Sequence, residues 1–144
     1  PCLRMISSMS PTILCRDGRP YVALGTPGGV RIFPSVAQAI VNIVDHGMTL
    51  QEAVEAPRVW TQGQELEVES TVPESMRQEL AGRGHTVKEV RAVAGGMNGV
   101  MFDQDTNTLT GAACWRADGG PSALSGGSAR PGTRFRPTVE RGGS

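Results

Sequence analysis

Two adjacent hydroxyl side chains and two adjacent glycines are the residues whose chemistry is easiest to name in this sequence. Ser7 and Ser8 open the segment Ser-Ser-Met-Ser-Pro-Thr, and Gly28 and Gly29 end the segment Gly-Thr-Pro-Gly-Gly. Hydroxyl groups donate hydrogen bonds to a carboxylate, and backbone amides beside glycine can bind an anion or a developing oxyanion. Neither pair combines a nucleophile with a neighbouring base, so we expect half of an active site whose reactive half lies elsewhere.

Each pair taken alone is more often structural than functional. A Thr-Pro-Gly-Gly segment is common in tight turns. The segment also lacks the Lys-Ser/Thr of a P-loop and the glycine spacing of a dinucleotide-binding fold. Ser7 and Ser8 are typical of surface hydroxyls ahead of a strand. Neither His46 nor His85 has a serine or cysteine at a recognisable motif spacing, so the sequence does not support a Ser-His-Asp triad.

The composition argues against several classes of partner and ligand. The 144 residues include 14 Lys+Arg and 14 Asp+Glu, so no overall field attracts nucleic acid or an acidic membrane. No apolar run approaches the roughly 20 residues that cross a bilayer, so we expect no membrane segment in this chain. The cysteines, Cys2, Cys15 and Cys114, are too few and too scattered for a disulfide framework or a CxxC metal site. We therefore expect no metal and no cofactor.

Turn residues and apolar periodicity place the first elements. Asp17-Gly18 predicts a hairpin that joins strands over 12–15 and 21–24. A wide apolar face with one narrow polar stripe predicts a helix over 34–46. With so little polar surface, this helix is expected to be mostly buried.

Capping boxes and alternating residues place the rest. Boxes that begin at Thr49 and Thr71 predict helices ending near residues 56 and 83, and 58–64 is expected to be irregular. The remaining predicted strands are 65–69, which is expected to be exposed, 86–90, 99–103 and 109–113. This order predicts an α+β fold in one domain over residues 1–125. A Gly/Ser/Pro/Arg-rich composition predicts a flexible tail over 126–144.

The serine segment, Asp17-Gly18 and the glycine loop together resemble the γ-glutamyltransferase (γ-glutamyltranspeptidase) family. The resemblance covers about residues 4–120, and the serine pair combined with the Pro-Gly-Gly loop is its most specific part. The further matching segments are Asn42-Ile43-Val44-Asp45-His46-Gly47-Met48, Glu52-Ala53-Val54-Glu55-Ala56-Pro57-Arg58 and Gly84-His85-Thr86-Val87.

The resemblance implies part of an N-terminal-nucleophile (Ntn) hydrolase αββα sandwich, with mostly antiparallel strands and helices packed on one side. In that family self-cleavage produces a large and a small subunit, and this chain resembles the C-terminal portion of the small one. A threonine exposed by cleavage attacks the γ-glutamyl amide and forms an acyl-enzyme. By motif match, Gly28 and Gly29 would supply the oxyanion-hole amides, and Ser7 and Ser8 would bind the substrate's α-carboxylate.

The nucleophile and the residues that bind the α-amino group are expected to lie outside this chain. The chain begins with Pro1 rather than Met, which favours a processed product or an excised fragment. We expect it to be inactive alone and to need the rest of the small subunit and the large subunit. Uncovered apolar faces would favour self-association. The compartment stays open, although the resemblance is compatible with a periplasmic or extracellular one.

The leading hypothesis is that the parent protein acts on glutathione-type γ-glutamyl amides. Two alternatives remain: a related Ntn acylase of the glutaryl or cephalosporin type, and a non-enzymatic relic that binds a ligand or partner. The serine pair favours γ-glutamyl substrates, because a simple acyl group has no α-carboxylate to bind. Trp60 replaces a histidine that is more usual in the family, and Cys114-Trp115 replaces an acidic residue and proline. Both changes favour a divergent substrate.

Overall fold

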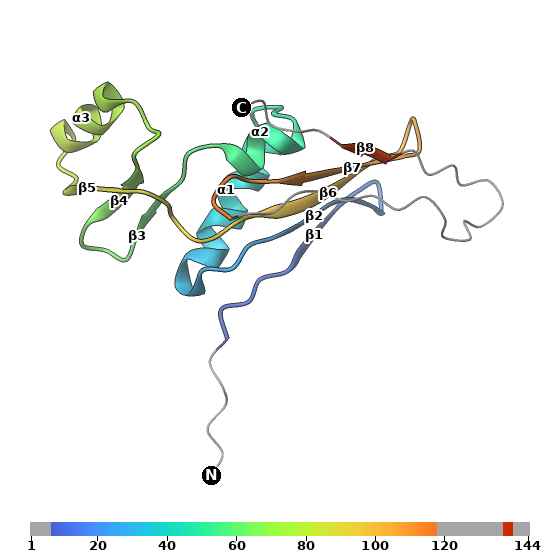
Figure 1. The fold of residues 1–144 in the computed structure, drawn as a ribbon, viewed down its shortest axis with the longest axis horizontal. Helices are drawn as coiled ribbons and strands as arrows, with labels where there is room; N and C mark the ends of the chain where they lie inside the picture. Colours follow the sequence, from blue (N-terminus) through green and yellow to red (C-terminus); the bar gives the residue numbers. More distant parts are fainter. Residues whose placement is uncertain (1–6, 118–136, 140–144) are drawn as a thin grey trace, which may run out of the picture.

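The computed structural model describes residues 7–117 and 137–139, which form two β-sheets and three α-helices (Figure 1). The larger sheet has the strand order β1-β2-β6-β7-β8, and the smaller has the order β3-β4-β5. The strands of the larger sheet are β1 (Thr12–Arg16), β2 (Arg19–Gly25), β6 (Asn98–Asp103), β7 (Thr108–Ala113) and β8 (Pro137–Val139). Those of the smaller sheet are β3 (Val59–Thr61), β4 (Leu66–Glu69) and β5 (Val87–Val90).

Most of the strand pairs are antiparallel, as predicted. Only β4–β5 and β7–β8 are parallel among the strands described. The β1–β2 hairpin turns at Asp17 and Gly18, whose φ values of 52° and 72° are both positive. Two positive values suit the twist of a two-residue hairpin, which explains why Asp-Gly specifies this turn.

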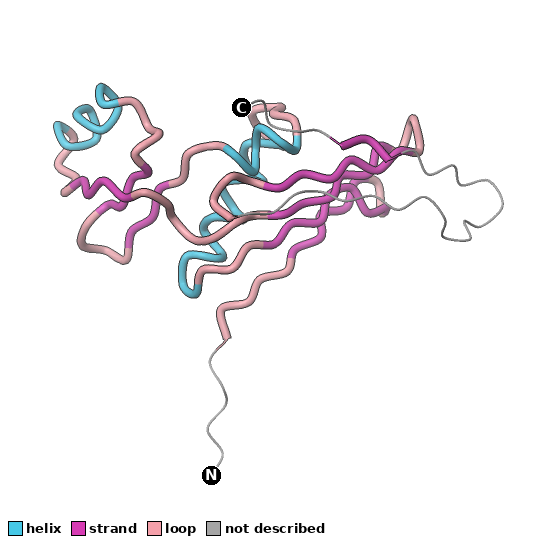
Figure 2. Tube along the Cα trace, viewed as in Figure 1, coloured by secondary structure: helices cyan, strands magenta, loops and turns pink. Residues whose placement is uncertain are grey.

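The helices are η1 (Gly29–Arg31, a 3₁₀ turn), α1 (Ile32–Val44), α2 (Leu50–Glu55) and α3 (Glu74–Gly82). Helix α1 contacts β2, while α2 contacts β6 and β7. Figure 2 shows α1 and α2 beside the larger sheet, whereas α3 lies with the smaller one. The predicted α+β architecture, with helices on one side of a mostly antiparallel sheet, is confirmed.

The core lies between the larger sheet and helices α1 and α2. Its fully buried aliphatic members include Val22, Leu24, Val36, Ala39, Leu50, Val54 and Met97. Helix α1 was expected to be mostly buried, and that prediction is wrong for its outer side. Phe33 is 71% exposed and Val44 57%. The helix packs only its inner face on the sheet and α2, so its apolar outer face has no cover within the described residues.

Two local predictions had different outcomes. The capping box at α2 is present, because Thr49 accepts a hydrogen bond from the Glu52 amide while the Glu52 carboxylate accepts one from the Thr49 amide. The box predicted at Thr71 is absent, since Pro73 is the N-cap of α3 without a side-chain bond. A proline costs nothing there, because the first helical amides have no intrahelical acceptor.

The segment around the smaller sheet differs most from expectation. Residues 59–61, predicted to be irregular, form β3 and pair with β4. Strand 65–69 was expected to be exposed, yet Val68 and Glu69 are fully buried at its end. Glu69 has ionic partners far away in the sequence, which alternation within the strand does not reveal.

The C-terminal prediction falls mostly outside the described residues. Within 126–144 the structure describes only β8, which pairs in parallel with β7. The domain range 1–125 and the tail therefore stay predictions. None of the helices described within residues 7–117 is long and apolar enough to cross a membrane.

Candidate active site

The loop after β2 is tied to the segment that precedes β6. The Thr26 hydroxyl, in a residue only 9% exposed, donates to the carbonyl oxygen of Gly95 at 3.0 Å. The Gly95 amide in turn donates to the carbonyl oxygen of Pro27 at 2.8 Å. These two hydrogen bonds fix the entrance of the loop against residues 93–97.

Gly28 and Gly29 occupy backbone conformations that favour glycine. Their φ values are +146° and +60°. A Cβ on Gly28 would lie 2.6 Å from the Ala94 Cβ, whereas a Cβ on Gly29 would meet nothing within 4 Å. Gly28 is thus required by a close approach of two backbones as well as by its dihedral angle.

The amides of these two glycines are free to bind a ligand. Both residues are exposed, and neither amide nitrogen donates a hydrogen bond to any residue that the structure describes. The Gly28 carbonyl accepts from the Arg31 amide at 3.2 Å, which begins the turn that leads into α1. Unpaired amides at the start of a helix attract negative charge. The loop therefore has the chemistry of an oxyanion or carboxylate site.

The serine pair lies in the extended segment before β1. Both residues are exposed. The Ser7 Oγ accepts from the Met9 amide at 3.3 Å, and the Ser10 hydroxyl donates to the Ser8 carbonyl at 3.2 Å. The Ser7 and Ser8 hydroxyls keep the capacity to donate to a ligand.

Sheet pairing brings the serine segment to the beginning of the glycine loop. Thr12 in β1 pairs with Leu24 in β2, so the residues before β1 lie beside those after β2. An open groove of about 470 Å³ is lined by Ser7, Met9, Ser10, Pro11, Gly25, Thr26 and Ile32. Ser7 thus shares a groove with the first residues of the loop, whereas Ser8, Gly28 and Gly29 do not line it.

A buried ionic cluster behind the loop is the largest feature that sequence reasoning missed. Arg58 is 2% exposed, and the side chains of Glu69 and Arg116 are fully buried. The Glu69 carboxylate accepts from the Arg116 guanidinium, with Nε at 2.6 Å, and from the amide of Val93 at 2.7 Å. The Arg58 Nη1 donates to the carbonyl oxygens of Val93 and Gly95.

Burial acts to lower the pKa of both buried arginines, whereas neighbouring charges act in either direction. Desolvation, with the neighbouring charge of Arg116, lowers the pKa of Arg58. Desolvation also acts to lower the pKa of Arg116, but the hydrogen bonds and charges of Glu69 and Cys114 together outweigh it, and the net shift is upward. Both guanidinium groups stay charged because an arginine titrates far above neutral pH.

An ion pair connects the glycine loop to the smaller sheet. Arg31, two residues after Gly29, donates to both carboxylate oxygens of Glu67 at 2.9 Å and lies over the Trp60 ring at 4.1 Å. The hydrogen bonding between Arg31 and Glu67 raises the pKa of Arg31 and lowers that of Glu67. The loop is thus held from both sheets.

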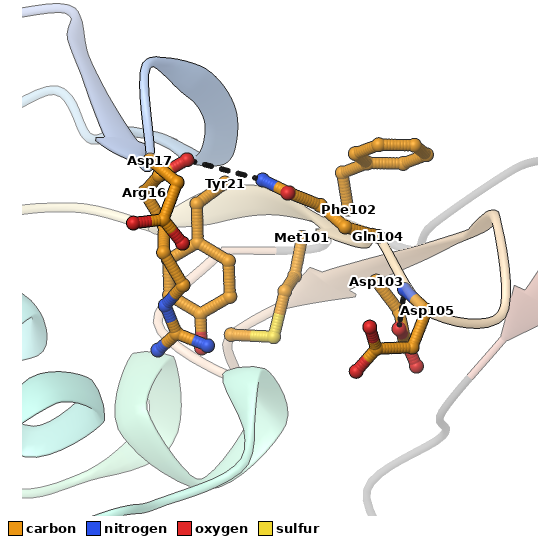
Figure 3. A pocket seen from close by; sticks show the side chains of 8 residues that line it. All are labelled: Arg16, Asp17, Tyr21, Met101, Phe102, Asp103, Gln104 and Asp105. Carbon is orange, nitrogen blue, oxygen red and sulfur yellow. Dashed lines mark hydrogen bonds between the residues drawn. The ribbon is translucent and has the colours of Figure 1, made fainter.

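A second cavity, of about 460 Å³, lies at the opposite end of the larger sheet (Figure 3). Figure 3 shows Arg16, which lies over the Tyr21 ring at 4.0 Å, and Gln104, whose amide donates to the Arg16 carbonyl. The register places Gly25 opposite Asn98 at one end of β2 and β6, and this cavity lies at the other end. It is separate from the glycine loop and contributes nothing to that site.

Comparison with known proteins gives one family and several relatives. The family model described as gamma-glutamyltranspeptidase matches residues 1–124. The acylase ACY 1 proenzyme of Pseudomonas sp. (strain V22) is 59% identical over 135 residues, covering 94% of this chain and 24% of that protein. The glutathione hydrolase proenzyme of Bacillus subtilis (strain 168) is 36% identical over 114 residues, covering 78% of this chain and 19% of that protein.

The fold has solved counterparts. A gamma-glutamyltranspeptidase from Pseudomonas nitroreducens complexed with L-DON superposes with a TM-score of 0.77 at 32% identity, covering 87% of this chain and 66% of that one. The chain therefore spans about a quarter or less of the length of these curated relatives and about two thirds of the solved chain.

Proposed function

The chain belongs to the gamma-glutamyltranspeptidase family, and on that basis we propose that it supplies the anion-binding half of an amide-hydrolysing active site. The observation that carries the proposal is the pair of exposed, unpaired amides at Gly28 and Gly29, held by the contacts of Thr26 and Pro27 with Gly95. The whole enzyme's activity requires residues beyond this chain.

The proposed chemistry is acyl transfer through a covalent intermediate. A nucleophile from outside this chain attacks the acyl carbonyl carbon, and the carbonyl oxygen becomes an oxyanion that accepts hydrogen bonds from the Gly28 and Gly29 amides. The amide C–N bond then breaks, and the amine leaves with a proton. Water, or an acceptor amine, attacks the acyl-enzyme and releases the acyl group.

The proposed substrates carry a carboxylate at the far end of the acyl group. The hydroxyls of Ser7 and Ser8 are suited to donate to it. We place γ-glutamyl amides first, with glutathione-type compounds as the substrate class. A glutaryl amide has a carboxylate at the same distance from its carbonyl, so the preference for γ-glutamyl substrates that was expected from the serine pair holds only against acyl groups without a carboxylate. The serine pair alone does not separate γ-glutamyl from glutaryl amides. The two substrates differ in the α-amino group, which only the γ-glutamyl amide carries.

A second candidate is an acylase that acts on glutaryl or cephalosporin-type amides. The observation in its favour is the 59% identity, over 94% of this chain, to a protein named an acylase. Comparing γ-glutamyl and glutaryl anilides as substrates of the assembled enzyme separates the candidates. Faster turnover of the glutaryl anilide would overturn the first candidate, and turnover of neither would favour a non-enzymatic relic.

Replacing Ser7 or Ser8 by Ala is expected to raise the KM for both carboxylated anilides by about 10-fold or more. A hydrogen bond to a charged group contributes about 1.5–3 kcal/mol, which corresponds to this change. The measurement is steady-state hydrolysis of γ-glutamyl, glutaryl and pentanoyl anilides. The pentanoyl compound has the same chain length without the carboxylate, so its KM should not change.

Ser70→Ala is the matched control, because Ser70 is an exposed serine at the smaller sheet, away from the groove. It should leave all three KM values as in the unsubstituted enzyme. An equal rise for the pentanoyl anilide in the Ser7 and Ser8 variants would show that they act on the loop rather than on a carboxylate.

The 144-residue chain by itself is expected to show no turnover. Residues 7–117 hold unpaired amides but no nucleophile hydrogen-bonded to a base, and apolar side chains such as Ile13 (68% exposed) and Phe33 (71%) lack cover among them. We expect it to self-associate or to order fully only with its complement. The check is a γ-glutamyl anilide assay with size-exclusion chromatography. Activity from a monodisperse monomer would contradict this expectation.

A further inference from the structure

The buried cluster behind the glycine loop has more positive than negative charge when only its arginine and glutamate side chains are counted. The Arg116 guanidinium pairs with the carboxylate of Glu69, to which Arg58 donates only its backbone amide. The buried Arg58 guanidinium itself donates to the carbonyl oxygens of Val54, Val93 and Gly95 and contacts no carboxylate among the described residues. Burying a charge without a partner is costly, so a second anion is expected nearby. The side chain that completes this contact set is Cys114.

The Cys114 sulfur is surrounded by hydrogen-bond donors. Cys114 is 2% exposed, and its Sγ lies 3.1 Å from the amide nitrogen of Met97 and 3.6 Å from the Arg58 Nη2. The backbone amide and the guanidinium of Arg116 also act to lower the pKa of this thiol. Within the described part of the chain, the thiol has no acceptor for an S–H proton. A thiolate, which only accepts, suits this environment.

We propose that Cys114 is a buried thiolate, the second anion of a cluster in which Glu69 and Cys114 together balance Arg58 and Arg116. Burial by itself raises the pKa of Cys114, but the hydrogen bonds from Met97 and Arg116 and the charge of Arg58 outweigh it. The net pKa is below the ordinary value of 9.0. Arg58, Arg116 and Glu69 are the charged groups that contact this sulfur or its partners.

The cluster also holds the segment on which the glycine loop rests. The Arg58 Nη1 donates to the carbonyl oxygens of Val93, at 3.2 Å, and Gly95, at 3.1 Å. Gly95 bonds to Pro27 and Thr26, and Ala94 lies directly against Gly28. Cys114 is therefore a positioning residue for the Gly28 and Gly29 amides. This positioning role rests on the proposed function, whereas the claim that Cys114 is a thiolate does not depend on it.

The direct test is the ultraviolet thiolate absorbance as a function of pH, recorded on the 144-residue chain within the assembled enzyme, with all other cysteines of that enzyme replaced by Ser. In this chain, replacing Cys2 and Cys15 by Ser leaves Cys114 as the only thiol. We expect a titration midpoint below the midpoint of the same protein in urea, and the Cys114→Ser variant should show no titration. A midpoint at or above the urea value would overturn the proposal, whatever the enzyme's activity.

Stability against pH gives a second, independent readout. A depressed pKa in the folded state means that the thiolate's stabilisation is fully present above the ordinary thiol pKa and lost as pH falls through the folded-state value. The Tm advantage of the unsubstituted chain over Cys114→Ser should therefore grow as pH rises. The Tm difference between Cys114→Asp and Cys114→Ser should stay constant over this range, because the Asp carboxylate is charged throughout it. A parallel pH dependence of Tm for the unsubstituted chain and Cys114→Ser would overturn the proposal.

The positioning role has its own readout in the assembled enzyme. Cys114→Ser should lower kcat more than Cys114→Asp, because only the latter keeps an anion beside Arg58. A confirmed thiolate with equal kcat in both variants would overturn the positioning role alone. Absence of any hydrolysis by the unsubstituted enzyme would instead count against the proposed function.

Discussion

Replacing Glu69 by Gln is expected to lower the free energy of unfolding by about 3–5 kcal/mol, the range typical of breaking a buried ion pair. The carboxylate is fully buried and accepts from the Arg116 guanidinium and the amides of Arg58 and Val93. Gln keeps one acceptor oxygen but leaves Arg116 without its charge partner. Urea unfolding followed by tryptophan fluorescence measures the effect.

Glu65→Gln is the control for this prediction. Glu65 pairs with Lys88 at 2.9 Å, but the two side chains are 50% and 53% exposed. An exposed pair contributes at most about 1 kcal/mol, because solvent screens it. If both variants lost the same stability, the buried pair of Glu69 and Arg116 would contribute no more than the exposed pair.

Replacing Gly28 by Ala is expected to lower kcat of the assembled enzyme by about 10²–10³, the loss typical of removing one oxyanion-hole donor. A Cβ at this position would lie 2.6 Å from the Ala94 Cβ and 2.8 Å from the Ala94 Cα. The loop must move to relieve this clash, and its two amides then no longer point toward the position of the oxyanion. The measurement is kcat with a γ-glutamyl anilide, on protein shown to be folded.

Gly63→Ala separates backbone strain from the clash. Gly63 also has a positive φ, +93°, but a Cβ there would meet nothing within 4 Å. It lies in the turn between β3 and β4. We expect this variant to lose some stability and to keep its kcat. Full activity in folded Gly28→Ala would contradict the oxyanion role.

Much of the fold follows from local chemistry that a sequence displays. Asp17-Gly18 specifies its hairpin because both turn residues need positive φ, and Thr49 with Glu52 caps α2 through bonds that span three residues. The glycine loop was found for the same reason, since Gly28 and Gly29 are adjacent. The sequence also indicated the family through these neighbouring motifs.

The buried cluster could not be found in this way, because its members are distant in sequence. Glu69 is 11 residues from Arg58 and 47 from Arg116. In a strand that alternates Glu with apolar residues, Glu69 resembles an exposed carboxylate until its partners are in place. Arg58 followed a proline in a segment expected to be irregular. Charge burial is a tertiary property, so only the structure reveals it.

The claim on which the account depends is that the Gly28 and Gly29 amides and the Ser7 and Ser8 hydroxyls face one bound substrate. The most direct test is a crystal structure of the assembled enzyme with L-glutamate, the product of γ-glutamyl hydrolysis. We predict that the α-carboxylate accepts from both serine hydroxyls and that a γ-carboxyl oxygen accepts from the two glycine amides. A glutamate bound elsewhere, or contacting one pair while the other faces away, would contradict the account.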